Sequence, residues 1–246
     1  MKKLYFLLFL LIMGTSALGQ QVTTRKITLD ESSVVKDSTG FQYPHGVWKK
    51  LIQSGNYGIK AGKRSSTDME FLIYELSAEE RTKRMESYPR PRETTNFKTG
   101  SKLPNFRFTD LKGNRYNLKE LTGKVVVLNF WFINCGPCRQ EIPDLNKMVL
   151  KYKDNPNVVF LAVALDSRAD VKEFLKKTPF LYNITENGSY LTQSYGVQGY
   201  PTHVVLDQNA IIKFHTAGLA INTIYWIDKT IENALSQSDT AGAAGM

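Results

Sequence analysis

The amino-acid sequence predicts an α/β fold with a mixed central sheet flanked by helices, preceded by an N-terminal extension. Two strongly apolar runs, residues 125–132 and 157–165, have the length and β-branched content of buried strands. Segments with helical spacing follow both runs, which is typical of βα units around a parallel sheet centre. Two later runs around Gln208 and Asn209 predict a hairpin, which adds antiparallel strands.

The region before the predicted sheet is polar and has only patchy periodicity. We expect a short strand within Ile27–Val35, an amphipathic helix within Tyr43–Ser54, and a strand or a helix start at Met69–Leu76. The sequence Ser77-Ala78-Glu79-Glu80 matches the S-x-x-E capping box and therefore predicts a helix N-terminus. Residues 88–95 contain two prolines and no apolar pattern, which indicates a linker.

The elements after residue 105 are more regular. Pro143 interrupts a segment of helical spacing and predicts a kink there, because proline cannot donate a backbone hydrogen bond. In chain order we expect a hairpin over 105–118, a helical turn over 118–121, a strand over 124–132, a helix over 139–152, a strand over 157–165, helices over 170–177 and 189–195, a hairpin of 202–207 with 210–216, and a closing helix over 221–235.

The first residues have the pattern of a secretory signal peptide. Lys2 and Lys3 are followed by the apolar run 4–13 and by a small-x-small cleavage site at 17–19. The apolar run is short for a bilayer span, so we expect cleavage and a periplasmic location. An uncleaved N-terminal membrane anchor is the alternative.

These features divide the chain into four parts. Residues 1–19 form the signal peptide, and residues 20–98 form an extension or small module of open role, namely capping, substrate recruitment or dimerisation. Residues 99–236 form the α/β domain. Residues 237–246 are small and polar, so we expect a flexible C-terminal tail.

The charge of the chain argues against one class of partner. The formal net charge is +9 over 246 residues, but the basic residues occur in short clusters with acidic residues between them. A nucleic-acid-binding surface requires a denser basic stripe or a known binding motif. We therefore expect no nucleic-acid partner.

Both cysteines of the chain lie in one tetrapeptide, Cys135-Gly136-Pro137-Cys138, between an apolar strand and a helix. A C-x-x-C at such a junction is typical of a redox dithiol, because the positive end of the helix dipole stabilises a thiolate. A structural disulfide across this short loop removes little chain entropy, and a structural zinc site needs four ligands. The pattern therefore favours a catalytic role.

Further motifs stand in a fixed order around this tetrapeptide. Asn129-Phe130-Trp131 precedes it, Glu141-Ile142-Pro143 follows it, and Val197–Thr202 ends in Tyr200-Pro201-Thr202 after the insertion 166–195. In this order the motifs resemble the thioredoxin superfamily, and within it the exported TlpA/ResA-like thiol-disulfide oxidoreductases, over residues 100–235. The resemblance implies a thioredoxin-like fold with the N-terminal extension outside it.

The resemblance also implies roles for single residues. Cys135 is expected to be the exposed nucleophile, and Cys138, one turn into the helix, the less exposed resolving thiol. Gly136 and Pro137 belong to the active-site motif and go with a reducing character in this family. Trp131, four residues before Cys135, is also counted as part of the active-site motif.

The loop before the last hairpin is expected to form the substrate groove. The resemblance implies a cis peptide bond before Pro201, although cis bonds are uncommon for proline in general. The backbone of Tyr200 would then lie beside the sulfur atoms and pair with a substrate chain.

The sequence departs from the thioredoxin pattern in its acid–base residues. Asn129 stands where thioredoxins carry a buried aspartate, and Ala162 stands where the partner lysine falls. Asn129 and Glu141 are the candidate acid–base residues, but an asparagine takes no proton at neutral pH. We interpret Glu141 as a solvated helix carboxylate and His203 as a core or surface residue, so no proton acceptor is evident.

Two functions remain open at this point. The first is an exported reductant of protein disulfides, with cytochrome c maturation and general disulfide reduction indistinguishable as substrates. Its only redox group would be the Cys135–Cys138 disulfide, with no further cofactor and no metal. The resemblance implies a membrane thiol protein as electron donor. The alternative is a thioredoxin-fold module that binds copper(I) or senses redox state without turnover.

Overall fold

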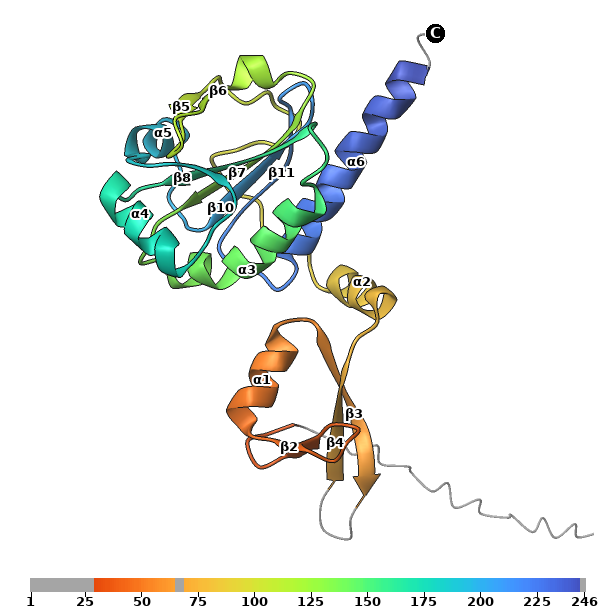
Figure 1. Ribbon diagram of the computed structural model, residues 1–246. Coiled ribbons are helices and arrows are strands. Elements are labelled where there is room, and N and C mark those ends of the chain that lie inside the picture. The colour runs from red at the N-terminus through yellow and green to blue at the C-terminus, as the bar shows by residue number, and fades with distance from the viewer. Residues whose placement is uncertain (1–28, 65–68, 244–246) are drawn as a thin grey trace, which may run out of the picture.

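The structure is a computed structural model that describes residues 29–64 and 69–243 (Figure 1). A small N-terminal unit and a larger α/β unit lie on either side of α2 (Ala78–Ser87). The predicted signal peptide lies outside the described residues. None of the helices in the described ranges combines the length and the apolar composition that a membrane span requires.

The N-terminal unit is a four-stranded sheet with one helix against it. The strand order is β2-β1-β4-β3, and a small core of Val35, Trp48, Phe71 and Ile73 joins the sheet to the helix. The elements are β1 (Val34–Lys36), β2 (Gln42–Tyr43), α1 (His45–Gln53), β3 (Tyr57–Arg64) and β4 (Met69–Glu75).

Strand β3 was not predicted from the sequence. It carries Gly58 and Gly62 among basic residues and lacks an apolar run, so its composition does not indicate a strand. Its conformation comes from antiparallel pairing with β4, which begins at the pair Tyr57 and Glu75. The alternatives that the sequence left open for residues 69–76 are resolved in favour of a strand.

The larger unit is built on a five-stranded sheet in the order β11-β10-β7-β8-β9. Strands β7, β8 and β9 are parallel, whereas β10 and β11 are antiparallel, which confirms the predicted parallel centre and added hairpin. The three-residue strand β9 was not predicted. The strands are β7 (Val125–Trp131), β8 (Val158–Ala164), β9 (Asn183–Thr185), β10 (Thr202–Leu206) and β11 (Ile212–Ala217).

Two apolar clusters cover the two faces of this sheet. Alternate residues of β7 divide between them, so that Val127 and Trp131 face one cluster and Leu128 and Phe130 face the other. The first cluster includes side chains of α3, α4 and α6, and the second lies under the β5–β6 hairpin and α5. The remaining elements are β5 (Arg107–Thr109), β6 (Arg115–Asn117), η1 (Leu118–Leu121), α3 (Gly136–Lys151), α4 (Arg168–Lys177), α5 (Ser189–Ser194) and α6 (Thr223–Ala243).

Two helix boundaries differ from the predictions. Helix α3 begins at Gly136 rather than residue 139, because Pro137 lies in the first turn, where a missing N–H costs no hydrogen bond. Helix α6 continues to Ala243, well into the segment 237–246 that we expected to be a flexible tail. The helix can continue because residues 236–241 contain neither proline nor glycine.

The segment that we predicted to be a linker is a strap along the sheet. The backbone carbonyl of Arg92 accepts a hydrogen bond from Thr216 Oγ1 at 2.8 Å, and the Thr94 N–H donates to His215 Nδ1 at 3.1 Å. Farther along, the Gly100 N–H donates to the Ile212 carbonyl at 2.8 Å. Residues 92–102 therefore cover the open edge of β11, which would otherwise expose unpaired backbone groups.

The strap and α2 are held by polar contacts as well. The predicted capping box is confirmed, since Ser77 Oγ accepts from the Glu80 N–H and Glu80 Oε2 accepts from the Ser77 N–H. Asn222, which is 1% exposed, donates from Nδ2 to the carbonyls of Met85 and Pro89, both at 3.1 Å. This side chain joins the end of α2 to the larger unit.

The substitution Asn222→Ala should destabilise this junction. It removes the donor to the buried Met85 carbonyl and to the part-buried Pro89 carbonyl, so we expect a loss of about 1–3 kcal/mol in the free energy of unfolding. Denaturant unfolding measures the loss, and limited proteolysis should show faster cleavage within residues 88–95. The matched control is Asn233→Ala, at an exposed position of α6. Equal stability of the two variants would contradict the assigned role.

Candidate active site

The cysteine pair lies where β7 ends and α3 begins. Cys135 is the N-cap residue of α3, and its Sγ is bonded to Cys138 Sγ at 2.01 Å. The Cys138 N–H also points to Cys135 Sγ, at an N–S distance of 3.2 Å. The sulfur of Cys135 thus accepts a backbone hydrogen bond and lies at the positive end of the helix dipole. Both interactions stabilise a thiolate after reduction.

The exposure of the two sulfur residues differs less than expected. Cys138 is 1% exposed, and Cys135 is only 5% exposed, so the expectation of an exposed Cys135 is wrong. Both residues belong to the same apolar cluster as Trp131 and Ile142.

The other residues of the active-site motif have distinct places. Apart from its chain neighbours and the backbone of α3, no heavy atom lies within 4 Å of a Cβ added at Gly136, so the first turn of α3 is open at this point. Pro137 occupies that same turn. Trp131 is 1% exposed, and its ring contacts those of Phe174 and Phe180 at centroid distances of 5.5 and 5.4 Å. It belongs to the core beneath the dithiol.

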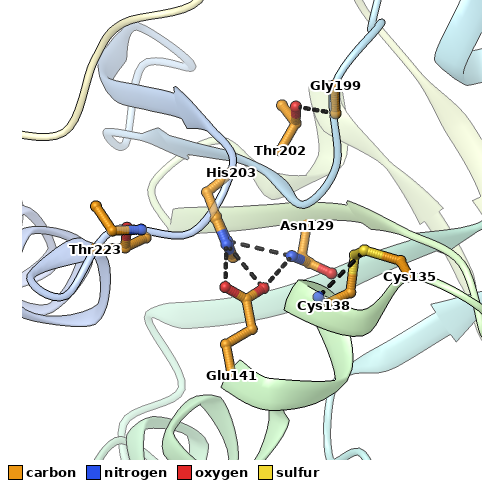
Figure 2. Close-up of polar contacts among 9 residues, drawn as sticks. Asn129, Cys135, Cys138, Glu141, Gly199, Thr202, His203 and Thr223 are labelled. Atoms are coloured by element: carbon orange, nitrogen blue, oxygen red, sulfur yellow. Dashed lines mark hydrogen bonds and ion pairs between the residues drawn. A yellow bond between two sulfur atoms is a disulfide. The ribbon is translucent and has the colours of Figure 1, made fainter. Parts of the chain in front are cut away.

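The loop that begins β10 lies next to the end of β7. The peptide bond between Tyr200 and Pro201 is cis, as the resemblance implied. Thr202 pairs with Phe130 of β7, and its Oγ1 donates to the Gly199 carbonyl at 2.7 Å (Figure 2). The Tyr200 ring packs edge-on against Phe132, with 5.3 Å between centroids. The predicted groove residues therefore stand beside the strand that leads to Cys135.

A carboxylate that the sequence analysis did not single out holds the segment before the dithiol. Asp166 Oδ2 accepts a hydrogen bond from the Ile133 N–H at 2.8 Å. Asp166 follows β8, whose neighbour β7 leads into Ile133 and then into Cys135. No sequence motif links these positions, because they are 33 residues apart and meet only through strand pairing.

Three buried polar side chains form a cluster beneath the first turns of α3. Glu141 lies within hydrogen-bonding distance of both other members, with its Oε1 3.3 Å from Asn129 Nδ2 and its Oε2 3.1 Å from His203 Nε2. Asn129 Nδ2 is also 3.3 Å from His203 Nδ1. The three residues are 1%, 3% and 0% exposed for Asn129, Glu141 and His203.

This cluster corrects the interpretation of Glu141 as a solvated carboxylate. Glu141 follows Cys138 by three positions on α3, so both side chains lie on the helix face that packs on the sheet. Figure 2 shows the amide of Asn129 between the disulfide and the pair formed by Glu141 and His203. The structure thus places a buried carboxylate one helical turn beyond Cys138.

Strand register explains how the cluster is assembled. Asn129 pairs with Ala162 on β8 and with His203 on β10, so the methyl group and the imidazole flank it in the sheet. Alternation along β10 puts His203 on the same face as Val205, towards α3. The sequence does show a histidine two residues after Pro201. It does not show the strand register that places this histidine beside Asn129.

The surroundings of the cluster are apolar or uncharged. Tyr182 is a further titratable group near it, and burial together with the charge of Glu141 raises the pKa of its hydroxyl well above the usual value. His215 lies opposite Val204 on the other face, and burial lowers the pKa of its imidazole.

Within the described part of the chain, no group of three or more His, Cys, Asp or Glu residues is arranged to hold a metal ion.

The fold and the disulfide together define a thioredoxin-like protein with a C-x-x-C pair at the start of α3. A model of the Redoxin family matches residues 98–235, which is more than half of the chain. The chain therefore belongs to the Redoxin family. The match begins after the N-terminal unit and α2, so these elements lie outside the part that the family defines.

Individual relatives carry related names. The chain is 31% identical over 124 residues to the thiol-disulfide oxidoreductase ResA of Halalkalibacterium halodurans. The matched region covers 50% of this chain and 70% of that protein. The chain is 34% identical over 111 residues to the ResA of Bacillus thuringiensis, with 45% of this chain and 64% of that protein covered. The latter match thus spans slightly less than two thirds of the relative.

A solved structure is similar over the same region. A crystal structure described as a thiol:disulfide interchange protein DsbE of Chlorobium tepidum has a TM-score of 0.52 and 32% sequence identity. The similarity covers 56% of this chain and 98% of the other. The larger unit therefore has the thioredoxin-like fold, and the N-terminal unit is additional to it.

The substitution His203→Ala should destabilise the fold strongly. It leaves the Glu141 carboxylate buried without its imidazole partner, which typically costs about 3–5 kcal/mol. Denaturant unfolding at neutral pH measures this cost. The control is His45→Ala, where a partly exposed imidazole lies 3.9 Å from an exposed Glu31, and an exposed pair of this kind contributes about 0–1 kcal/mol. Comparable losses in both variants would contradict the buried pair.

Proposed function

We propose that this chain is a thiol-disulfide oxidoreductase that reduces disulfides in proteins. The observation that carries the proposal is the Cys135–Cys138 disulfide at the N-terminus of α3, beside the loop that contains Pro201. The names of the ResA relatives support the same reaction class. The coupling of a nucleophilic and a resolving thiol in one helical turn is what dithiol–disulfide exchange requires.

The first step transfers one sulfur bond. In the reduced protein the Cys135 thiolate attacks a substrate disulfide, so that a new bond forms between Cys135 Sγ and one substrate sulfur while the substrate bond breaks. The second substrate sulfur leaves as a thiolate and takes a proton from solvent. The backbone hydrogen bond at Cys135 Sγ and the helix dipole favour the thiolate that this step needs.

The second step needs a proton acceptor, because Cys138 is buried and must lose its proton before it attacks. We assign this role to Glu141, which lies one helical turn beyond Cys138 and faces the same way. The Cys138 thiolate attacks Cys135 Sγ, the protein disulfide forms, and the remaining substrate sulfur leaves and is protonated. Two electrons have then passed from the dithiol to the substrate.

The loop before β10 is the proposed substrate groove. Thr202 pairs with Phe130 near the end of β7, which places the loop at Tyr200 beside the strand that leads to Cys135. An extended substrate segment can form backbone hydrogen bonds with this loop, as peptides do with exposed strands. Tyr200 and Phe132 together supply an aromatic wall for the substrate residues that flank the disulfide.

The cellular setting is inferred from the sequence. We propose that residues 1–19 direct export and that the protein acts in the periplasm, with an uncleaved anchor as the alternative. A reductant in an oxidising compartment depends on an electron supply, so we propose a membrane thiol protein as donor. Apocytochrome c disulfides are the proposed substrate class.

Cysteine variants test the reaction. Cys135→Ser should abolish the reduction of insulin disulfides, because no nucleophile remains, whereas Cys138→Ser should accumulate mixed disulfides that cannot be resolved. Turbidity measures insulin reduction, and mass spectrometry of the trapped Cys138→Ser complexes in the exporting organism identifies the substrates. Full activity in Cys135→Ser would overturn the proposal. Stoichiometric copper(I) binding without any disulfide exchange would instead support the copper-binding alternative.

Glu141→Gln tests the proton acceptor. An amide cannot accept the Cys138 proton, so turnover should fall by about 100-fold or more, in the range of general acid–base effects. Alkylation of Cys135 by iodoacetamide should proceed at the wild-type rate, since Glu141 acts on the other thiol. Glu173→Gln, at an exposed carboxylate on α4 that pairs with Lys176, is the matched control. Wild-type turnover in Glu141→Gln would exclude Glu141 as the acceptor.

A further inference from the structure

His203 is a buried histidine that the proposed exchange steps leave without a task. Its imidazole is 0% exposed and lies 3.0 Å from Glu141 Oε1 and 3.1 Å from Oε2, both measured from Nε2. Its other ring nitrogen, Nδ1, is 3.3 Å from Asn129 Nδ2. A histidine held between a carboxylate and an amide can exchange a proton with the first and a hydrogen bond with the second.

The hydrogen-bonding capacity of the three groups determines where the protons lie. The NH₂ group of Asn129 only donates, so Nδ1 of His203 must accept, and the imidazole proton is on Nε2. That proton is donated to Glu141, whose carboxylate also accepts from Asn129. In this arrangement His203 is neutral and Glu141 is ionised, and each close contact pairs one donor with one acceptor.

Adding a proton to His203 conflicts with this arrangement. A proton on Nδ1 would face the NH₂ group of Asn129, so that two donors would meet at 3.3 Å. The conflict is removed if the Asn129 amide turns over, because its carbonyl oxygen then accepts from Nδ1. The amide gives up its contact with Glu141 in this orientation, and the imidazolium next to Glu141 compensates the carboxylate charge.

The other end of the same amide faces the disulfide. Figure 2 shows the Asn129 oxygen on the side of the sulfur atoms and its nitrogen on the side of Glu141 and His203. With His203 neutral, the oxygen can accept a hydrogen bond from a Cys138 thiol. With His203 protonated and the amide turned, the NH₂ group can donate to a Cys138 thiolate.

We propose that His203 is a positioning residue that stores the proton of Cys138 with Glu141 and, through the orientation of Asn129, stabilises the Cys138 thiolate. This inference rests on the proposed dithiol exchange. In the second step the proton leaves the Cys138 thiol for the Glu141–His203 pair, and the amide turns its NH₂ group to the new thiolate. After Cys138 attacks Cys135 Sγ, the pair returns its proton to solvent or to the leaving substrate thiolate.

The position of His203 in the sheet supports this role. Asn129 is flanked by Ala162 on β8, which offers only a methyl group, and by His203 on β10. The basic partner of the buried site therefore comes from β10. On β11 Thr216 lies opposite His203, and the charge of Glu141 acts on Tyr182, whose hydroxyl has a pKa well above the usual value and stays protonated at neutral pH.

A two-phase reaction separates the two cysteines. The reduced protein is mixed with the chromogenic disulfide dithiobis-nitrobenzoate, and stopped-flow absorbance follows the thiolate that each step releases. The first phase reports attack by Cys135, and the second reports resolution by Cys138. For the wild type we expect the second phase to accelerate as the pH rises, because the acceptor must be unprotonated before it takes the Cys138 proton.

The variant His203→Gln keeps a hydrogen-bonding side chain but cannot take up a proton. We expect an unchanged first phase, a second phase about 100-fold slower at neutral pH, and a weaker acceleration of that phase with rising pH. The matched control is His215→Gln, a buried histidine on the opposite face of the sheet, which should retain the wild-type pH profile. A wild-type second phase in His203→Gln overturns the proposal.

The double variant Asn129→Asp with His203→Gln distinguishes proton storage from a structural effect. An aspartate at position 129 can accept the Cys138 proton directly, so the second phase should recover although His203 is absent. A double variant as slow as His203→Gln overturns the proposal. Absence of the first phase in the wild type would instead contradict the thiol-disulfide function itself.

A measurement on the unmodified protein covers the case in which these variants do not fold. Nuclear magnetic resonance of the His203 ring nitrogens should show the Nε2–H form in the reduced protein at neutral pH. The chemical shifts of the two ring nitrogens should differ between the reduced and the oxidised protein, because only the reduced Cys138 interacts through Asn129. Identical shifts of both nitrogens in the two redox states overturn the proposal.

Discussion

The burial of the Glu141 carboxylate is the constraint on which the architecture of the larger unit depends. An ionised group inside a protein costs several kcal/mol unless hydrogen bonds and an opposite charge or dipole compensate it. Here the compensation comes from Asn129 on β7 and His203 on β10, while Glu141 itself is on α3. These contacts therefore fix the position of α3 along the strands and its rotation about its own axis.

That position of α3 determines the geometry of the dithiol. Cys135 and Cys138 occupy the first turn of the same helix, so they are placed by the contacts that Glu141 makes one turn later. The segment before Cys135 is held independently by Asp166, and the loop at Pro201 is placed by pairing of β10 with β7. Pairing of the strands and the position of α3 thus bring the disulfide, the loop at Pro201 and the buried pair of Glu141 and His203 to the same end of the sheet.

The N-terminal part has a different relation to the site. Residues 92–102 cover the edge of β11, and Asn222 joins α2 to the larger unit, both away from the dithiol. The edge is thereby protected against pairing with other chains. The sheet of the N-terminal unit has its own small apolar core, so this part of the chain forms a second unit beside the Redoxin domain rather than an extra layer on it.

Local sequence patterns determined much of this protein. The apolar runs, the capping box at Ser77 and the C-x-x-C tetrapeptide predicted the central strands, α2 and the dithiol, because each depends on residues that are close in the chain. Strand β3, the strap over β11 and the burial of Glu141 could not be predicted in this way. They depend on strand register and helix rotation, which bring Glu141 to His203 across 62 positions, and only the tertiary structure decides such contacts.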